Sequence, residues 1–225
     1  MQVIPILYED NDILIVNKQS GLAVQGGEGI LHPLDAVLAE QTGQKVFLVH
    51  RLDRDTAGIL VVAKNPRAAA KYTEIFAGKR AKKEYCAFCC GLPPKESGMI
   101  NASVEQRGTE KSALTRYQVK SKAVFTTEDS TVNLCCINWT IETGRMHQIR
   151  IHAAKLGAPV VADDKHGNFK TNKILKKALG AKKLMLAAVR LTIPIKAADG
   201  RETLRTFEIP LPDHMQNFAE RAGLV

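Results

Sequence analysis

The segment Leu48–Asn65, LVHRLDRDTAGILVVAKN, sets a dense group of charges directly before an apolar run. Five of the six residues from His50 to Asp55 are His, Arg or Asp. The run Gly58–Lys64 that follows is short, apolar and β-branched, which is typical of a buried strand. Either a surface loop or an active site at the edge of a sheet would place so much charge at the start of such a strand.

Strand-like and helix-like segments lie on both sides of this segment, without a regular βαβ order. We therefore expect an α+β fold with a mixed, largely antiparallel sheet and flanking helices. Strands are expected at Val3–Tyr8, Asp12–Val16, Gly58–Lys64, Lys83–Cys90, Gly98–Glu105, Ala113–Lys120, Val132–Glu142, Lys183–Ile195 and Leu204–Pro212. Helices are expected at Pro33–Gln41, Pro66–Gly78, Arg145–Leu156 and Asp213–Arg221.

The chain has 225 residues, 45% of them hydrophobic, and no long linker rich in Pro, Gly and Ser. A single domain over 1–225 is the simplest organisation. Lys and Arg number 32 against 23 Asp and Glu, a net charge of +9, which favours a nucleic-acid partner over a merely solvated basic surface. The excess gathers in Gly78–Tyr85 and in Lys165–Ala198, where no acidic residue occurs.

The amino terminus lacks a signal-peptide pattern, and no apolar run is long enough to span a membrane. The five cysteines fit a cytoplasmic protein with buried free thiols. Cys86 and Cys89 form a C-x-x-C pattern, but in a strand they would point to opposite faces. His147 and His152 are five residues apart and would not share a helix face. We expect neither a metal site nor a cofactor.

The charged loop contains a carboxylate placed for chemistry. Asp53 lies between Arg51 and Arg54, and neighbouring cations keep a carboxylate ionised and ready to act as a nucleophile or base. The alternative is a surface loop of ion pairs, which would contribute little.

Two further segments contain residues suited to binding a ligand, one before and within the expected helix at Arg150 and one at Tyr85. Thr143 and Gly144 precede the expected helix, whose first backbone N–H groups would meet an anion, and Arg150 would hold a carboxylate. An ordinary amphipathic helix is the alternative. Tyr85 adjoins a basic cluster and would stack on an unpaired base, unless it only packs in the core.

Together and in this order, the segments resemble the RluA-type pseudouridine synthases over nearly the whole chain, from Ile6 to Met215. The resemblance is carried by ILYEDNDILIVNKQSGLAV (6–24), HRLDRDTAGILVVAK (50–64), KKEYCAFCCG (82–91), TGRMHQIRIHAAKLGAPVVAD (143–163) and FEIPLPDHM (207–215).

The resemblance implies an isomerase that converts selected uridines in structured ribosomal or transfer RNA to pseudouridine, by base flipping and without a cofactor. Asp53 matches the family's essential aspartate, Arg150 the arginine that pairs with it, and Tyr85 the tyrosine that stacks on the target base. Arg51 matches the residue that fills the gap left by the flipped nucleotide. Further substrate contacts are expected from His50, Arg54, Thr56, Arg145, His147, Gln148 and Lys18.

The sequence departs from the family pattern at positions near the expected pocket or RNA face. Ala162 and His166 stand in VADDKHG where the family has Gly and Tyr, and Ala57, Met146 and Ala187 replace Ser, Thr and His. The resemblance also implies a catalytic domain without an N-terminal S4 RNA-binding domain. RNA would then be bound by Lys79–Lys83 and Lys165–Lys183.

Two rival functions remain open from the sequence. One is a non-catalytic RNA-binding protein of the same fold. The other is a glycosidic-bond hydrolase in which Asp53 works with Glu142 or Asp163. A monomer is expected in each case.

Overall fold

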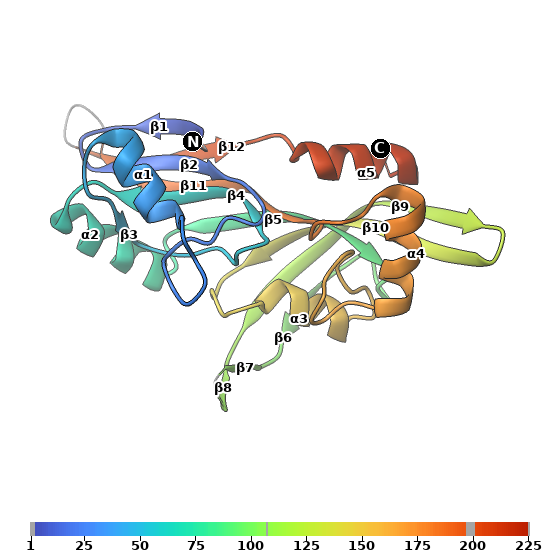
Figure 1. Ribbon diagram of the computed structural model, residues 1–225. Coiled ribbons are helices and arrows are strands. Elements are labelled where there is room, and N and C mark those ends of the chain that lie inside the picture. Colours follow the sequence, from blue (N-terminus) through green and yellow to red (C-terminus); the bar gives the residue numbers. More distant parts are fainter. Residues whose placement is uncertain (1–2, 107, 197–200, 225) are drawn as a thin grey trace. The chain divides into compact units, whose positions relative to one another are not determined.

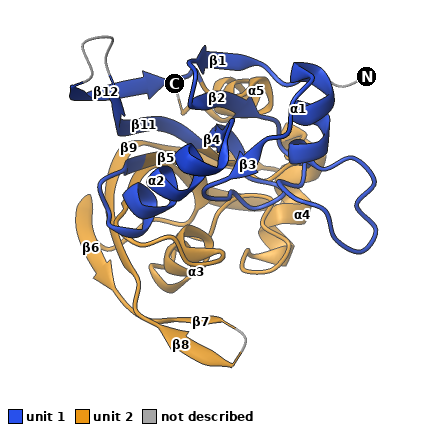
Figure 2. Cartoon of the chain, turned by 90° about the vertical axis from the view of Figure 1, so that its left-hand side faces the viewer, with its two compact units in different colours: residues 1–83, 188–210 blue, residues 84–187, 211–225 orange. Residues whose placement is uncertain are grey.

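The computed structural model describes residues 3–106, 108–196 and 201–224, which form two compact units (Figure 1). Unit 1 comprises residues 1–83 and 188–210, and unit 2 comprises residues 84–187 and 211–225, coloured blue and orange in Figure 2. The expectation of a single catalytic domain over 1–225 stays a prediction.

Unit 1 is a sheet with two helices. Its strands follow the order β1-β2-β4-β11, and β12 pairs with β11 while the short β3 pairs with β4. Each pairing of β1 with β2, β2 with β4, β3 with β4 and β11 with β12 is antiparallel. The elements are β1 Ile6–Glu9, β2 Ile13–Lys18, α1 Leu34–Thr42, β3 Phe47–Leu48, β4 Ala57–Ala63, α2 Pro66–Ala77, β11 Leu186–Lys196 and β12 Glu202–Glu208.

Local chemistry fixes the ends of these elements. Asp10 Oδ1 accepts hydrogen bonds from the backbone N–H groups of Asp12 (2.7 Å) and Ile13 (2.8 Å), which closes the turn between β1 and β2. Asn65 caps α2 by accepting from the Ala68 N–H, and Pro66 occupies the first turn.

The apolar faces of β2 and β4 hold unit 1 together. Ile13, Ile15, Ile59 and Val61 pack in one core with residues of α2, including the fully buried Tyr72. The alternate residues of the two strands are buried as well, so both faces of this part of the sheet are covered. β4 is therefore a central buried strand, and the charged loop His50–Asp55 leads directly into it.

Unit 2 has a sheet of order β5-β10-β9-β6, a separate β7-β8 pair, and three helices. β9 and β10 form a long antiparallel hairpin, with a break in register between Cys136 and Ile137. The elements are β5 Lys82–Cys90, β6 Ser97–Asn101, β7 Val104–Gln106, β8 Thr109–Lys111, β9 Leu114–Thr127, β10 Ser130–Ile141, α3 Gln148–Lys155, α4 Phe169–Leu179 and α5 Asp213–Ala222.

Aromatic side chains anchor the helices and strands of unit 2. Phe88 of β5 contacts Phe218 of α5, with 5.6 Å between ring centroids, and Trp139 of β10 contacts Tyr117 of β9 at 5.8 Å. Ser121 Oγ donates to the carbonyl of Leu224, which ties the end of the chain to β9 (2.8 Å).

The expected fold class, α+β with a mixed, largely antiparallel sheet and flanking helices, is confirmed. The helix expected after Thr143 and Gly144 begins three residues later than predicted, because α3 begins at Gln148 and His147 before it is left-handed, with φ 55°. Helix α4 was missed, since its lysines were interpreted only as charge. Its signals were the Asn168 cap, the C-terminal Gly180 and a sparse apolar stripe at Leu175 and Leu179.

Gly58, at the point where the charged loop enters β4, is the glycine most tightly enclosed by backbone in unit 1. It has φ +117°, and an added Cβ would lie 2.2 Å from the carbonyl oxygen of Ala188 in β11. We expect Gly58→Ala to lower the free energy of unfolding by about 3 kcal/mol or more, because strain and overpacking add. Urea unfolding measures the loss.

Gly43→Ala is the matched control, since Gly43 also has a positive φ (+68°) but open space around it. Its expected loss is about 1 kcal/mol, from backbone strain alone. Equal losses in the two variants would contradict the packing argument.

Candidate functional site

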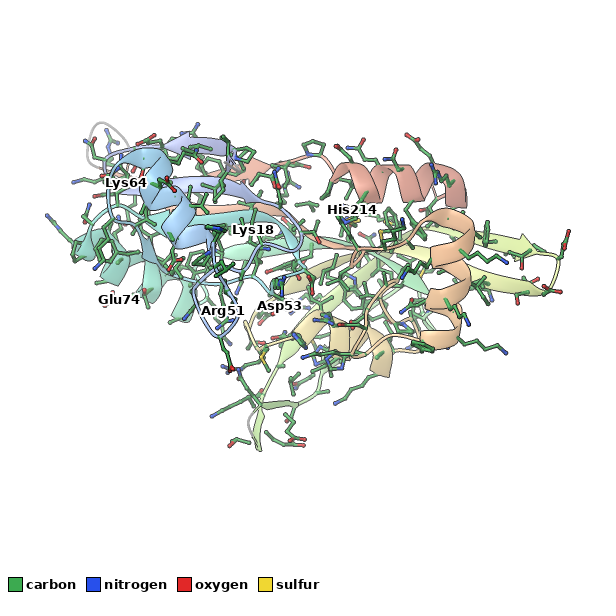
Figure 3. All side chains as sticks on the ribbon, viewed as in Figure 1. Lys18, Arg51, Asp53, Lys64, Glu74 and His214 are labelled. Carbon is green, nitrogen blue, oxygen red and sulfur yellow. The ribbon has the colours of Figure 1, made fainter. Side chains whose placement is uncertain are left out.

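The charged loop of unit 1 is held by a buried lysine. Lys18, at the end of β2, is fully buried, and its ammonium donates to the carbonyl oxygens of Gln19 (3.0 Å), Leu22 (2.8 Å) and Arg54 (2.8 Å). The first two carbonyls belong to the loop after β2 and the third to the charged loop. One cation therefore joins the two loops and shapes the backbone next to Asp53 (Figure 3).

Three more hydrogen bonds reinforce this junction. The Gly21 N–H donates to the carbonyl of Arg54 (2.9 Å), and Arg54 Nε donates back to the carbonyl of Gly21 (3.0 Å). Ser20 Oγ donates to the carbonyl of Asp55 (2.8 Å). Asp53 itself is half-buried, and its carbonyl accepts from the N–H of the buried Thr56 (3.2 Å). The loop around Asp53 is thus fixed mainly through its backbone.

Burial brings the pKa of Lys18 close to neutral pH. Desolvation lowers the pKa of Lys18 to about 7, and the carboxylates of Asp55 and Asp53 oppose this shift. Lys18 was expected to contact substrate, but its amine is directed into the protein.

His50 is also engaged within unit 1. Its Nε2 accepts the backbone N–H of Val61 (2.9 Å), and its ring stacks on Phe76 with 3.9 Å between centroids. Burial lowers the pKa of His50 to about 3, and Lys83 adds to this effect, so the ring is neutral. The neutral imidazole of His50 thus supports the charged loop through its contacts with Val61 and Phe76 and adds no charge to it.

Arg51 and Arg54 are the exposed cations of the charged loop. Arg54 lines a cavity of about 350 Å³ on unit 1. The remaining lining residues are Ser20, Gly21, Leu22, Ala23, Ile30, Leu31 and His32.

Arg150 is the central cation of unit 2. It is buried in α3, and its Nε and Nη2 donate to Asp163 Oδ2 (2.7 Å) and Oδ1 (2.6 Å) in a bidentate pair. Nη2 also donates to Asp164 Oδ1 (3.1 Å). Asp163 and Asp164 were not expected as partners of Arg150, and the expected pairing of Arg150 with Asp53 stays a prediction.

Asp163 is bonded on all sides. Desolvation by itself would raise the pKa of Asp163, but hydrogen bonds from Arg150 and from the N–H groups of His166 and Lys165 outweigh it and hold the pKa below its usual range. Its carbonyl accepts from Asn172 Nδ2 (2.9 Å). The preceding Ala162 has φ 59°, the left-handed region that the family's glycine would adopt without strain.

Gln148 organises the turn before α3. Its Oε1 accepts from Thr143 Oγ1 (2.8 Å) and the Arg145 N–H (3.0 Å). Its Nε2 donates to the carbonyl of Leu114 (3.1 Å) and to Thr115 Oγ1 (2.8 Å). With its amide used on both sides, the buried Gln148 acts on the turn that carries Arg145. Arg145 is exposed, and its Nε donates to a backbone carbonyl at Ser112 (3.2 Å).

His147 and His166 form an imidazole pair. His147 Nδ1 lies 3.0 Å from His166 Nε2, with the rings edge to face. Burial lowers the pKa of His166, Arg150 and Lys165 lower it further, and the nearby carboxylates of Asp163 and Asp164 oppose them. The pair therefore shares one hydrogen rather than carrying two charges. The histidine that departs from the family's tyrosine thus has a defined partner.

Tyr85 lies in β5 of unit 2 and is 8% exposed. Its position in a buried strand is compatible with both interpretations of the sequence, packing and base stacking. Among the residues that the structure describes, no three His, Cys, Asp or Glu side chains gather to hold a metal ion. No helix in that part of the chain is long and apolar enough to cross a membrane.

The chain belongs to the RNA pseudouridylate synthase family, whose sequence model matches residues 12–155. A ribosomal large subunit pseudouridine synthase C from Rickettsia felis is 38% identical over 170 residues, covering 72% of this chain and 56% of that protein. The protein of the same name from Haemophilus influenzae is 34% identical over 222 residues, covering 96% of this chain and 68% of that protein. The chain thus spans little more than half the length of the Rickettsia relatives it matches.

The solved structure titled human RNA pseudouridylate synthase domain containing 4 has a TM-score of 0.75 at 24% identity, covering 97% of this chain and 93% of that chain. At this identity the likeness shows the fold alone, and it confirms the expected pseudouridine synthase fold.

The bidentate pair in unit 2 predicts a large and pH-dependent effect of Asp163→Asn. Losing the carboxylate should lower the free energy of unfolding by about 3 kcal/mol or more at neutral pH, since it breaks a buried ion pair. Because the folded pKa of Asp163 is lowered, its contribution is present above the unfolded pKa of about 3.9 and is lost as the pH falls through the folded value. Urea unfolding at pH 7 and at lower pH measures the difference.

Asp164→Asn is the control for this prediction. The Asp164 side chain is 77% exposed and accepts one bond from Arg150, so its loss should be below about 1 kcal/mol. A similar cost for both variants would contradict the assignment of Asp163 as the partner that stabilises Arg150.

Proposed function

We propose that this protein is an RNA pseudouridine synthase, an isomerase that detaches the uracil of selected uridines and rejoins it to ribose through carbon. The observation that carries the proposal is the family match over residues 12–155, which includes Asp53, Tyr85 and Arg150. The clamped loop around Asp53 supports it, because a reacting group needs a fixed backbone.

Asp53 is assigned the role of nucleophile or base. Its carboxylate would attack the base, attack the sugar C1′ or remove a ribose proton, and these routes stay open. We assign Lys18, His50 and Thr56 to positioning this loop, because each is engaged within unit 1.

Arg150 is assigned to pair with Asp53, as the family resemblance implies. A guanidinium offers five N–H donors, and the bonds to Asp163 and Asp164 use those on Nε and Nη2. Tyr85 is assigned to stack on the target base and to assist in removing its C5 proton.

RNA is the proposed partner, with ribosomal RNA favoured by the names of the relatives and transfer RNA as the alternative. Phosphate contacts would come from the lysines of the segment Lys165–Lys183, which are exposed. In the second basic cluster Arg80 pairs with Glu202 (2.8 Å), so less of its charge is available. Arg51, Arg54 and Arg145 are exposed, and we assign them to RNA, with Arg51 filling the gap left by the flipped nucleotide.

The finer assignments complete the proposal. A single catalytic domain in a cytoplasmic monomer is proposed, without an ion or cofactor. His147 is assigned to contact the substrate, with its ring oriented by the hydrogen bond to His166. Gln148 is assigned to hold the turn that carries Arg145.

The rival hydrolase needs a second carboxyl that is protonated at the working pH. Asp163 does not suit that role, because its pKa is lowered and both of its oxygens accept hydrogen bonds. Glu142 forms an ion pair with Arg116 (3.2 Å). These contacts favour an isomerase with one reacting carboxylate. The other rival, a non-catalytic RNA-binding protein, predicts no product at all.

Asp53→Asn should abolish catalysis while RNA affinity is retained. The amide keeps the shape of the side chain but neither attacks nor accepts a proton, so we expect a fall in rate of at least about 10³-fold. Pseudouridine mapping of RNA from cells that lack the gene, with each variant supplied in trans, measures it. Asp55→Asn is the control, since Asp55 lies in the same loop and its carbonyl bond to Ser20 is unaffected.

A site that is lost on deletion, restored by Asp55→Asn and not by Asp53→Asn would confirm the assignment and name the substrate. Full restoration by Asp53→Asn would refute it.

Charge reversal on α4 should weaken RNA binding. Lys176 and Lys177 are exposed at the end of this helix. If both lysines contact phosphates, Lys176→Glu with Lys177→Glu should make the negative slope of log K against log salt shallower by about 1.5, because two counterions are no longer released. Lys45→Glu with Lys95→Glu, also exposed but outside the acid-free segment, is the control. An equal change in both double variants would place the RNA surface elsewhere.

A further inference from the structure

All five cysteines lie on two neighbouring strands of unit 2, β5 and β10, and all are free and buried. The proposed reaction uses none of them. Their number and placement therefore call for a separate explanation.

One pair of thiols lies at bonding range across the two strands. Cys86 Sγ is 3.5 Å from Cys136 Sγ. A disulfide has a sulfur–sulfur distance of about 2.05 Å, so closure requires an approach of about 1.5 Å. Rotation of two side chains and a small strand shift can supply such a movement.

Cys136 lies next to a break in the register between β9 and β10. It pairs with Ser121, whereas Ile137 pairs with Val119, which leaves Lys120 as an extra residue in β9. Such a bulge bends a strand and re-aims its side chains. The backbone of β10 beside Cys136 is therefore less constrained than it would be in a regularly paired strand.

The two thiols are chemically unequal. The hydrogen bond with Cys86 lowers the pKa of Cys136 against the opposing effect of burial, and the Lys120 ammonium lowers it further. The same hydrogen bond and burial raise the pKa of Cys86. Of the two sulfurs, the thiolate form is favoured at Cys136, and a thiolate is the form that reacts with oxidants.

Among the other three thiols, Cys89 is hydrogen-bonded to Cys135. Cys135 Sγ donates to the carbonyl of Gly91 (3.3 Å), and Cys90 Sγ donates to that of Pro159 (3.5 Å). Burial raises the pKa values of Cys89 and Cys90, the latter to about 11. Cys136 is the most exposed of the five, at 9%.

We propose that Cys86 and Cys136 form a redox-active dithiol that peroxides convert to a disulfide. The Cys136 thiolate attacks one oxygen of hydrogen peroxide, breaks the O–O bond and becomes a sulfenic acid, releasing hydroxide. Cys86 then attacks the Cys136 sulfur, a second hydroxide leaves, and the S–S bond forms. Two thiols and one peroxide give one disulfide and two waters, with two electrons passing from sulfur to oxygen.

The disulfide would have a consequence for the proposed site. Tyr85 directly precedes Cys86 in β5, so a covalent link at Cys86 constrains the backbone that carries Tyr85. This consequence rests on the proposed function, whereas the oxidation itself does not.

The test uses the whole folded chain and measures bonds rather than activity. Protein treated with hydrogen peroxide and then with catalase is denatured, and its thiols are titrated. Of the five thiols, three should remain. Tryptic peptides 84–95 and 123–145 should appear linked, about 2 Da below the sum of their masses because two hydrogens are lost, and fragmentation should join Cys86 to Cys136. Dithiothreitol should restore all five thiols.

Cys86→Ala and Cys136→Ala should each abolish the link, and Cys90→Ala, in the same peptide as Cys86, should retain it. The measurement on the unaltered chain decides the question even if a variant fails to fold. Five remaining thiols, a link between Cys89 and Cys135, or over-oxidation that dithiothreitol does not reverse would each overturn the proposal.

Discussion

A buried ammonium is the interaction on which the proposed chemistry depends most. Lys18 is fully buried, and burial lowers its pKa to about 7. In return it joins the loop after β2 to the backbone at Arg54, one residue from Asp53. A buried cation that is satisfied by three carbonyls fixes a loop more specifically than apolar packing does.

In unit 2 the charges are reversed, because the proposed catalytic group is a cation and the group that supports it is a buried carboxylate. There the proposed catalytic cation, Arg150, is buried and is held by Asp163, whose own position is fixed by two backbone N–H groups. In each unit a buried charge with hydrogen bonds from the same unit therefore supports the proposed catalytic residue. Substitutions of these supporting residues should affect catalysis through geometry, which separates them from Asp53.

The sequence predicts most of the fold, because strands such as Gly58–Lys64 and the capped helix after Asn65 combine local propensity with burial. It also singles out Arg150 as a candidate site residue. It does not predict Asp163 as the carboxylate that holds Arg150, because that contact joins α3 to the turn at the left-handed Ala162. Nor does it reveal that Lys18, His50 and Gln148 face inward, since a polar residue in a motif looks the same whether it binds substrate or backbone.

The central claim is that the chain moves a glycosidic bond from nitrogen to carbon. RNA labelled with tritium at C5 of uridine, taken from cells that lack the gene, tests it directly when incubated with the purified protein. An isomerase must lose the C5 hydrogen, so tritium should appear in water while the label on unmodified uridine falls and no free uracil forms. Release of tritiated uracil would indicate a hydrolase, and no release of any kind would contradict catalysis on that RNA.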